Sequence, residues 1–194
     1  MPPELAQSDQ ALMRRAAAGD RDAFAAIYAR HQGAVYRFAR LMTGSHVTAE
    51  DVVQDVFLAL MADAARYDPA RAALSTYLFG SARHHTRRRL VRDRRFVALA
   101  ADDATPMAPA TDPAWNLAQG EELLRLRRAI LSLPSRYREM IVLCELQDRS
   151  YTDAAAIACC AVGTVRSRLH RARRMLADKM LRPHIPPAAL RCLA

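Results

Sequence analysis

The chain has 194 residues with 29 Lys or Arg and 20 Asp or Glu, which gives a formal net charge of +9 and a pI of about 10.1. This length fits one or two small domains, and the basic excess indicates an anionic partner, either nucleic acid or an acidic membrane surface. No apolar run approaches the roughly 20 residues of a membrane span, and the N-terminal residues show no signal-peptide pattern. We therefore expect a cytoplasmic protein with no membrane insertion of its own.

The cysteines and histidines do not predict a metal site or a disulfide framework. Of the 4 cysteines, Cys159 and Cys160 are adjacent, and no C-x-x-C pair occurs, a spacing that suits neither zinc nor a disulfide scaffold. We expect Cys144 and one of the adjacent pair to be small buried residues, and Cys192 to be an exposed thiol. His31 lies on an apolar helical stripe, and we interpret it as a core or boundary histidine rather than a metal ligand. No metal and no cofactor are expected.

Helical periodicity dominates the first half of the chain. A short helix is predicted at 10–18, and a longer one from about 24 to 41, capped by Asp20 or Asp22. A third helix is predicted to begin with Thr48 as its N-cap and an acidic residue three positions later. Its apolar positions, which we expect in the core, are Val52, Val53, Val56, Phe57 and Leu60.

The opposite face of this third helix is acidic, with Glu50, Asp51, Gln54 and Asp55 on its outward side. In so basic a chain, an acidic patch on one exposed face is consistent with a surface for a protein partner rather than for DNA. Composition alone favours the alternative, an ordinary solvated helix face.

A loop and then an arginine-rich helix end the first half. The Asp-Pro pair at 68–69 is a turn signal, and a helix is predicted from about Leu74. It begins with Tyr77, Leu78 and Phe79 and ends in a run of arginines. Aromatic rings that stack on unpaired bases, beside guanidinium groups that hold phosphates, are typical of sites for opened DNA. The alternative is that the rings are core and the arginines a solvated helix end; in either case we expect Phe79 or Leu78 in the core.

Residues 96–120 differ from both flanks, because they contain no Lys or Arg and spread three prolines among small residues. Acidic residues appear there at Asp102, Asp103 and Asp112. This composition predicts a flexible linker between two domains, with Trp115 near its end as an anchor on the second domain.

Short helices are predicted throughout the second half. One pattern covers 121–133, and after a proline a strongly apolar helix, which we expect Ser135 to cap, continues to Leu146. A third helix is predicted to start at Ser150 as its N-cap, with Asp153 three residues later, close to a capping box.

The stretch 162–175 predicts a DNA-binding helix behind a short turn at 159–161. A small helix, a tight turn and an arginine-faced helix form the layout of a helix-turn-helix, whose second helix enters the major groove. The alternative is a basic amphipathic helix that lies on a solvated surface. The apolar stripe of this helix is Val162, Val165, Leu169, Ala172 and Leu176.

Together these elements predict an all-α protein of two small helical domains joined by a flexible acidic linker, the second domain ending in the helix-turn-helix. The predicted division is an N-terminal arm with a short helix at 1–19, a first domain at 20–95, the linker at 96–120, a second domain at 121–180 and a tail at 181–194.

Taken in order, these segments resemble the extracytoplasmic-function, or group 4, sigma factors of bacterial RNA polymerase. The resemblance covers roughly residues 20–95 and 121–180. The segments that carry it are Ala49 to Phe57 (AEDVVQDVF), Leu74 to Phe79 (LSTYLF), Leu133 to Arg136 (LPSR), Ser150-Tyr151, and Val162 to Leu169 (VGTVRSRL).

The resemblance implies a transcription initiation factor rather than an enzyme. Its first domain would bind core RNA polymerase at the clamp helices of the largest subunit, and would recognise and open the −10 promoter element by capturing an unstacked base. Its second domain would meet the polymerase flap and read the −35 element, and the linker would thread toward the active-site channel. An anti-sigma factor would control it, with the apolar surfaces around Phe57, Leu60 and Met61 as candidate contacts.

The resemblance also implies three groups of site residues. Those for core polymerase are Asp51, Gln54 and Asp55. Those for the −10 element are Tyr67, Tyr77 and His84 as pocket or edge contacts, Arg83, Arg87 and Arg88 on phosphates, and Arg71 as a further contact. Those for the −35 element are Thr164, Arg166, Ser167 and Arg171 on base edges, where arginine pairs with guanine, and Arg168, Arg173 and Arg174 on phosphates.

The chain departs from the family pattern at a few of these positions. Tyr77 stands where Trp is usual, and His84 stands where Asn is frequent. In the turn of the helix-turn-helix, Cys159 and Ala161 replace the common Gly and Pro. A residue other than glycine at Cys159 adopts a positive φ only at an energetic cost.

Rival classes explain less of the sequence. A regulator that binds DNA without polymerase accounts for 121–180 but leaves the first domain without a role. A nucleic-acid enzyme would need a nucleotide loop or a metal set, and neither G-x-x-x-x-G-K nor H-E-x-x-H occurs. A sigma-mimicking regulator that titrates an anti-sigma factor would carry a receiver domain, whose alternating strand and helix pattern is missing.

Overall fold

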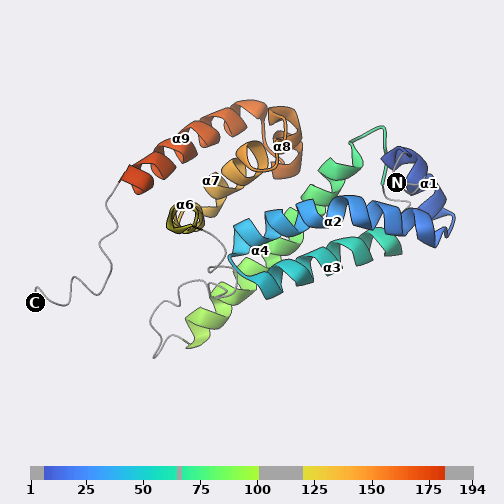
Figure 1. Cartoon of the computed structure of the whole chain (residues 1–194), viewed down its shortest axis with the longest axis horizontal. Coiled ribbons are helices and arrows are strands. Elements are labelled where there is room, and N and C mark those ends of the chain that lie inside the picture. The colour runs from blue at the N-terminus through green and yellow to red at the C-terminus, as the bar shows by residue number, and fades with distance from the viewer. Residues whose placement is uncertain (1–6, 65–66, 101–119, 182–194) are drawn as a thin grey trace, which may run out of the picture.

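The computed structural model describes residues 7–64, 67–100 and 120–181, and within these ranges the chain is helical and forms no strand (Figure 1). The all-α prediction is therefore confirmed. The elements in order are α1 (Asp9–Ala17), α2 (Arg21–Thr43), α3 (His46–Ala62), α4 (Leu74–Ala100), α6 (Glu121–Leu131), α7 (Ser135–Met140), the π-helical segment η3 (Ile141–Glu145), α8 (Tyr151–Ala158) and α9 (Val162–Leu181).

Helices α2, α3 and α4 pack pairwise to form the first unit, and α1 lies on α2. Phe38 of α2 meets Phe79 of α4 edge to face, with ring centroids 5.5 Å apart, a favoured geometry for a buried aromatic pair. Leu78 and Phe79 are both buried, and so are all the residues of α3 that the apolar pattern predicts for the core. Burial of these side chains supplies the main favourable free energy of the unit.

The short helix α1 is fixed to α2 by a charge cluster. Asp9 pairs with Arg30, and its other carboxylate oxygen lies 2.9 Å from Nε2 of His31. Burial lowers the pKa of His31 by disfavouring the charged ring, and Asp9 opposes this shift. His31 is thus a boundary histidine with a carboxylate partner, as its place on the apolar stripe predicts.

Four helix starts test the predicted caps. Asp20 caps α2, where its side chain accepts hydrogen bonds from the N–H groups of Asp22 and Ala23. The prediction of Thr48 as an N-cap is wrong: α3 begins earlier, and Ser45 accepts from the N–H of Thr48 at 3.2 Å. Serine is a better N-cap than threonine, so the helix begins at the earlier residue.

The predicted cap at Ser135 is also wrong. Ser135 is the first residue of α7, and Pro134 holds the N-cap position without a side-chain bond. The carbonyl oxygen of Pro134 accepts from the N–H groups of Tyr137 and Arg138 at 2.9 and 3.0 Å. Proline fits there because it has an extended backbone and needs no N–H partner of its own.

Helix α4 continues to Ala100, which corrects the predicted linker boundary at residue 96. Residues 96–100 contain no Gly or Pro that would end a helix. The rest of the predicted linker, with Trp115, lies at 101–119 and outside the described residues. Of the predicted tail at 181–194, only Leu181 is described, at the end of α9.

The second unit is built from α6 to α9. Ser150 caps α8 as predicted, because its Oγ accepts from the N–H of Asp153 at 3.0 Å. In α9, Val165, Leu169 and Ala172 are fully buried, while the remaining members of the apolar stripe are partly buried against the same core. The helix-turn-helix of α8 and α9 therefore rests on this stripe and leaves its arginine face outward.

The apolar helix predicted to run through 140–146 is not regular. Helix α7 ends at Met140, and Ile141–Glu145 forms a π-helical turn. Leu146, at the end of the predicted apolar helix, is 40% exposed. The wider turn changes which residues share a face, so a uniform helical period does not describe this segment.

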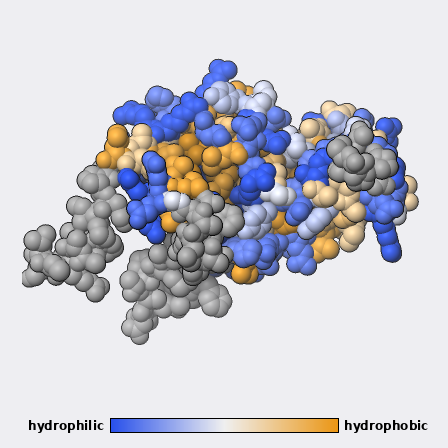
Figure 2. All heavy atoms as spheres, in the orientation of Figure 1, coloured by the Kyte–Doolittle hydropathy of each residue, from blue (hydrophilic) through white to orange (hydrophobic). Residues whose placement is uncertain are grey.

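The two units pack against each other rather than standing apart. Helix α4 contacts α8, and α2 contacts α6, α7 and η3. Their buried side chains form one continuous apolar cluster. Figure 2 shows a mainly hydrophilic surface around an area of hydrophobic residues that lies over the second unit.

The described cysteines are arranged much as expected. Cys144 and one of the adjacent pair, Cys160, are partly buried against the core, and Cys159 is exposed; Cys192 lies outside the described residues. Cys159 ends α8 in the left-handed conformation with φ of 51°. The turn of the helix-turn-helix takes a positive φ there, and Sγ of Cys159 lies 3.7 Å from the carbonyl oxygen of Ala156.

We predict that Cys159→Gly stabilises the protein. Glycine adopts a positive φ without the steric cost of a Cβ, so the free energy of unfolding should rise by about 1 kcal/mol, which for a chain of this size raises the Tm by roughly 2–4 °C. Thermal unfolding followed by circular dichroism measures the change. Cys159→Ala is the matched control, since it removes the thiol and keeps the strain; an equal gain in that variant would contradict the backbone explanation.

Candidate nucleic-acid and polymerase interfaces

The outward face of α9 presents most of the predicted −35 residues to solvent. Arg166, Ser167, Arg171 and Arg174 are exposed, and Thr164 is half-buried. The Ser167 hydroxyl donates to the carbonyl oxygen of Thr164 at 3.1 Å. Because the opposite stripe is buried, α9 is held rigidly with this face free, the arrangement that a helix needs to enter a major groove.

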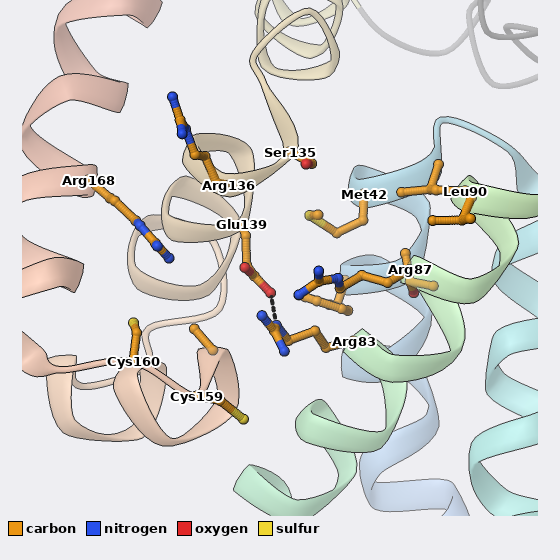
Figure 3. Close-up of a pocket in the computed structure, with 14 residues that line it drawn as sticks. Met42, Arg83, Arg87, Leu90, Ser135, Arg136, Glu139, Cys159, Cys160 and Arg168 are labelled. Carbon is orange, nitrogen blue, oxygen red and sulfur yellow. Dashed lines mark hydrogen bonds and ion pairs between the residues drawn. The ribbon is translucent and has the colours of Figure 1, made fainter. Parts of the chain in front are cut away.

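Two arginines of α9 differ from the rest. Arg173 donates from Nε to Glu145 of η3 at 3.1 Å, and the carboxylate raises the pKa of Arg173. Arg168 is half-buried and points into a cavity between the two units (Figure 3). The structure therefore ties Arg173 to the π-helical turn and turns Arg168 away from the exposed face.

Tyr137 of α7 lies beneath α9 and links it to the rest of the unit. A hydrogen bond from Arg171 is the main cause that lowers the pKa of Tyr137. Arg136 lies over the same ring, with its guanidinium carbon 4.8 Å from the centroid. Tyr137 thus lies beside two arginines, although sequence periodicity does not single it out.

The predicted −10 residues come together at the start and along one side of α4. The rings of Tyr67 and Tyr77 lie edge to face with centroids 5.7 Å apart, and burial raises the pKa of Tyr67. His84 is exposed and its ring lies 5.5 Å from that of His85. The remaining exposed members of this group are Arg71, Arg87 and Arg88. Arg83 is the exception, because it forms an ion pair with Glu139 of the second unit.

The acidic face of α3 is paired rather than merely solvated. Asp51 and Asp55 each accept a hydrogen bond of 2.6 Å from Arg89 of α4, and Gln54 between them is exposed. Burial acts to lower the pKa of Arg89, but the two carboxylates outweigh it and raise the value. His85 lies 3.5 Å from Asp55, and burial lowers the pKa of His85.

Arg89 is a residue that the sequence does not reveal as part of this face. It lies 34 residues from Asp55 and inside a run of similar arginines, so no local pattern distinguishes it from its neighbours. It joins the surface of α3 to the arginine-rich helix α4.

Beside the acidic face lies an open groove between α2 and α3, with a volume of about 550 Å³. Tyr28, Leu58 and Met61 are exposed large apolar residues along it. Of the predicted anti-sigma contacts, Met61 lies on this surface and Phe57 lines it while 4% exposed. Leu60 is 1% exposed and faces the core beneath this surface, as its place in the apolar pattern predicts.

No three His, Cys, Asp or Glu side chains gather into a metal site among the residues that the structure describes. Within the same ranges, none of the helices has the length and apolar character of a membrane span.

These features define a class of protein: a DNA-binding factor with a helix-turn-helix in one helical unit and an aromatic and arginine surface in the other. Two family models match the chain, sigma-70 region 2 at residues 27–96 and sigma-70 region 4 at residues 123–176. The chain belongs to the extracytoplasmic-function sigma factors of bacterial RNA polymerase, and it directs promoter-specific initiation of transcription.

Individual relatives agree with this assignment. The chain is 34% identical to the extracytoplasmic-function sigma factor SigM of Mycobacterium tuberculosis (strain H37Rv) over 173 residues, which cover 88% of this chain and 84% of SigM. It is 29% identical to SigW of Bacillus subtilis (strain 168) over 171 residues, which cover 84% of this chain and 91% of SigW.

Solved structures show the same fold. The sigma factor RpoE of Bartonella quintana, in complex with the anti-sigma factor NepR, matches with a TM-score of 0.69 and 29% identity over 81% of this chain and 96% of RpoE. CnrH, in complex with the cytosolic domain of CnrY, matches with a TM-score of 0.67 and 29% identity over 89% of this chain and 96% of CnrH.

We predict that Arg89→Met lowers the stability of the first unit. The variant leaves Asp51 and Asp55 side by side without their shared cation, but both carboxylates are partly solvated, so the expected loss is only about 1 kcal/mol in the free energy of unfolding. Urea denaturation measures it. Arg88→Met, at an exposed neighbour, should change stability by less than about 0.5 kcal/mol; equal losses in both variants would contradict a specific role for Arg89.

Proposed function

We propose that this sigma factor reads the −35 element with α9 and opens the −10 element with the surface formed by Tyr67, Tyr77 and α4. The proposed domains are the first at 20–95, extended along α4, and the second at 121–180. The observation that carries the proposal is the single rigid helix α9, whose apolar stripe is buried while its arginine face is exposed, in the region that matches sigma-70 region 4.

At the −35 element, the N-terminal turns of α9 would enter the major groove. Thr164, Arg166, Ser167 and Arg171 would contact base edges, because arginine pairs with guanine through two hydrogen bonds and hydroxyl groups accept or donate to either base type. Phosphate contacts, which position the helix without reading sequence, would come from Arg168, Arg173 and Arg174.

At the −10 element, the paired rings of Tyr67 and Tyr77 offer a surface on which an unpaired base can stack. Exposed His84 would meet the edge of a neighbouring base. The arginines that would hold the backbone of the opened strand are Arg71, Arg83, Arg87 and Arg88. Stacking on aromatic rings is sequence-tolerant, so the edge contacts would set which base is preferred.

Core polymerase would bind the surface of α3 that carries Asp51, Gln54 and Asp55, at the clamp helices of its largest subunit, while the second domain meets the flap. Arg89 holds both carboxylates at fixed positions, so that this surface is pre-ordered before polymerase arrives. Pre-ordering lowers the entropy cost of association.

An anti-sigma factor is the proposed negative regulator. The similar structures RpoE and CnrH were solved with NepR and the cytosolic domain of CnrY bound. On this chain the groove between α2 and α3, with exposed Tyr28, Leu58 and Met61, offers an apolar surface that an amphipathic helix could cover. Such a helix would also obstruct the neighbouring polymerase surface.

As an initiation factor the chain would catalyse no reaction of its own and would act in the cytoplasm, where polymerase and chromosomal DNA are found. A regulator that binds DNA without polymerase is the remaining rival. That rival needs no polymerase surface on α3, and this difference allows a direct test.

Run-off transcription with purified core polymerase and a library of random promoters provides that test. New start sites that share two spaced motifs are expected only when the protein is present. Gln54→Arg should abolish them by placing a cation on the acidic surface, whereas Gln10→Arg, at an exposed position of α1, should have no effect. DNA binding in gel shifts without new start sites would establish the regulator instead.

We further predict that Arg166→Ala weakens −35 recognition in a base-specific manner. Loss of a bidentate contact costs about 1–3 kcal/mol of discrimination at one base pair, which corresponds to a loss of roughly 5- to 150-fold in transcription from the selected promoter. Arg174→Ala is the control, since a lost phosphate contact weakens all promoters alike. Promoter libraries sequenced after transcription with each variant separate the two; equal preference at every position in both would contradict the assignment.

A further inference from the structure

Besides the shared apolar cluster, the two domains meet through polar side chains that come from both of them. Arg149 donates to Oγ of Ser75 at 3.0 Å, and its guanidinium carbon lies 4.8 Å from the ring centroid of Phe79. Thr76 donates to Asp153 of α8 at 3.1 Å. The segment that leads into the helix-turn-helix is therefore joined to the start of the helix proposed to open the promoter.

A cavity of about 530 Å³ lies next to this junction, between α4 on one side and α7 to α9 on the other (Figure 3). Arg83 and Arg87 extend into it from α4, Arg168 extends into it from α9, and Arg136 of α7 lines it. Among the described residues that line the cavity, Glu139 is the only carboxylate. One negative charge therefore faces several positively charged guanidinium groups around the same cavity.

Glu139 itself is 6% exposed and forms an ion pair with Arg83, which is also largely removed from solvent. The carboxylate reaches this arginine only because the domains are closed, since the two residues are 56 positions apart and belong to different domains. Without the carboxylate, closing the domains would leave the largely buried Arg83 with no opposite charge beside further guanidinium groups, which is unfavourable.

We propose that Glu139 is an electrostatic latch: its ion pair with Arg83 keeps the two domains closed in the free protein and withholds Arg83 and Arg168 from DNA. The second half of this statement rests on the proposed function, which assigns both arginines to promoter DNA. The first half concerns the shape of the free protein and does not depend on that assignment.

The same chemistry explains how the latch would open. Arg83 cannot pair with Glu139 and with a DNA phosphate at once, so the phosphates of a bound strand compete with the carboxylate for the guanidinium group. Once Arg83 is taken, the carboxylate no longer offsets the repulsion among Arg87, Arg136 and Arg168, and the domains separate. Promoter DNA and closure would therefore exclude each other.

The distance between the domains in the free, full-length protein tests closure directly. Double electron–electron resonance between two spin labels measures this distance. The labels are attached at Ala59→Cys on α3 and Ala177→Cys on α9, both exposed positions. The native cysteines are first replaced by serine. We expect a single narrow distance distribution for Glu139 and a longer, broader one for Glu139→Gln. An unchanged distribution in Glu139→Gln, or a broad one before the change, would overturn the latch.

Two further variants separate the ion pair from general effects of charge and folding. Glu122→Gln removes the same charge from an exposed position on α6 and should stay closed; opening in this variant would count against a specific pair. The exchange of Arg83→Glu with Glu139→Arg keeps the net charge of the cavity and should restore the narrow distribution, which a variant that had merely lost its fold could not do. Failure of the exchange in a protein with unchanged helix content would overturn the proposal.

Fluorescence anisotropy with a short duplex of random sequence tests the withholding of DNA contacts. If about one molecule in ten is open, removing the latch should tighten binding roughly tenfold. Opening without tighter binding would show that the closed form does not shield DNA contacts. Absence of promoter activity in run-off transcription would contradict the proposed function. The distance measurement would still decide whether Glu139 keeps the domains closed.

Discussion

The structure depends on which arginines have a carboxylate partner. The chain has 29 Lys or Arg against 20 Asp or Glu, so the acidic residues cannot neutralise every cation. Such pairs in the described chain include Asp20 with Arg15, Asp9 with Arg30, Asp51 and Asp55 with Arg89, Glu139 with Arg83, and Glu145 with Arg173. Each joins one element to another or closes a helix end, so these arginines help to hold the fold together.

Helix α4 shows how this sorting works within one element. Its start supplies Leu78 and Phe79 to the core, Arg83 meets the second domain, Arg89 meets α3, and Arg87 and Arg88 remain exposed. Because α4 makes all these contacts at once, a change in the position of the second domain alters the charge environment of the very helix proposed to open DNA.

The elements that could be predicted from sequence are those with local causes. The apolar stripe of α9 and the capping of α8 by Ser150 depend on residues within one or two turns, and both are present as predicted. The starts at Ser45 and Pro134 were missed because neighbouring residues can fill the same role. The π-helical turn at Ile141–Glu145 has no sequence signal of its own.

The least predictable parts of the candidate site are contacts between distant segments. Arg83 and Arg89 look alike in a run of arginines, and only the folded chain shows that one meets Glu139 and the other the acidic face of α3. The resemblance to sigma factors supplied the roles of the DNA-facing residues, but it could not show that the domains would lie together. That arrangement depends on contacts between side chains that lie on opposite sides of the predicted linker in the sequence.

Asp153 has two functions in the structure. Its backbone N–H and its carboxylate both bond to Oγ of Ser150, the N-cap of α8, and the carboxylate also accepts the hydrogen bond from Thr76 of the other domain. When the domains part, the first turn of α8 loses one of the bonds that hold its capping carboxylate in place. The local stability of the helix-turn-helix is therefore linked to the position of the other domain. Amide hydrogens of this turn would exchange with solvent faster in the open form. The exchange rate within the helix-turn-helix would therefore depend on whether the two domains are closed or open.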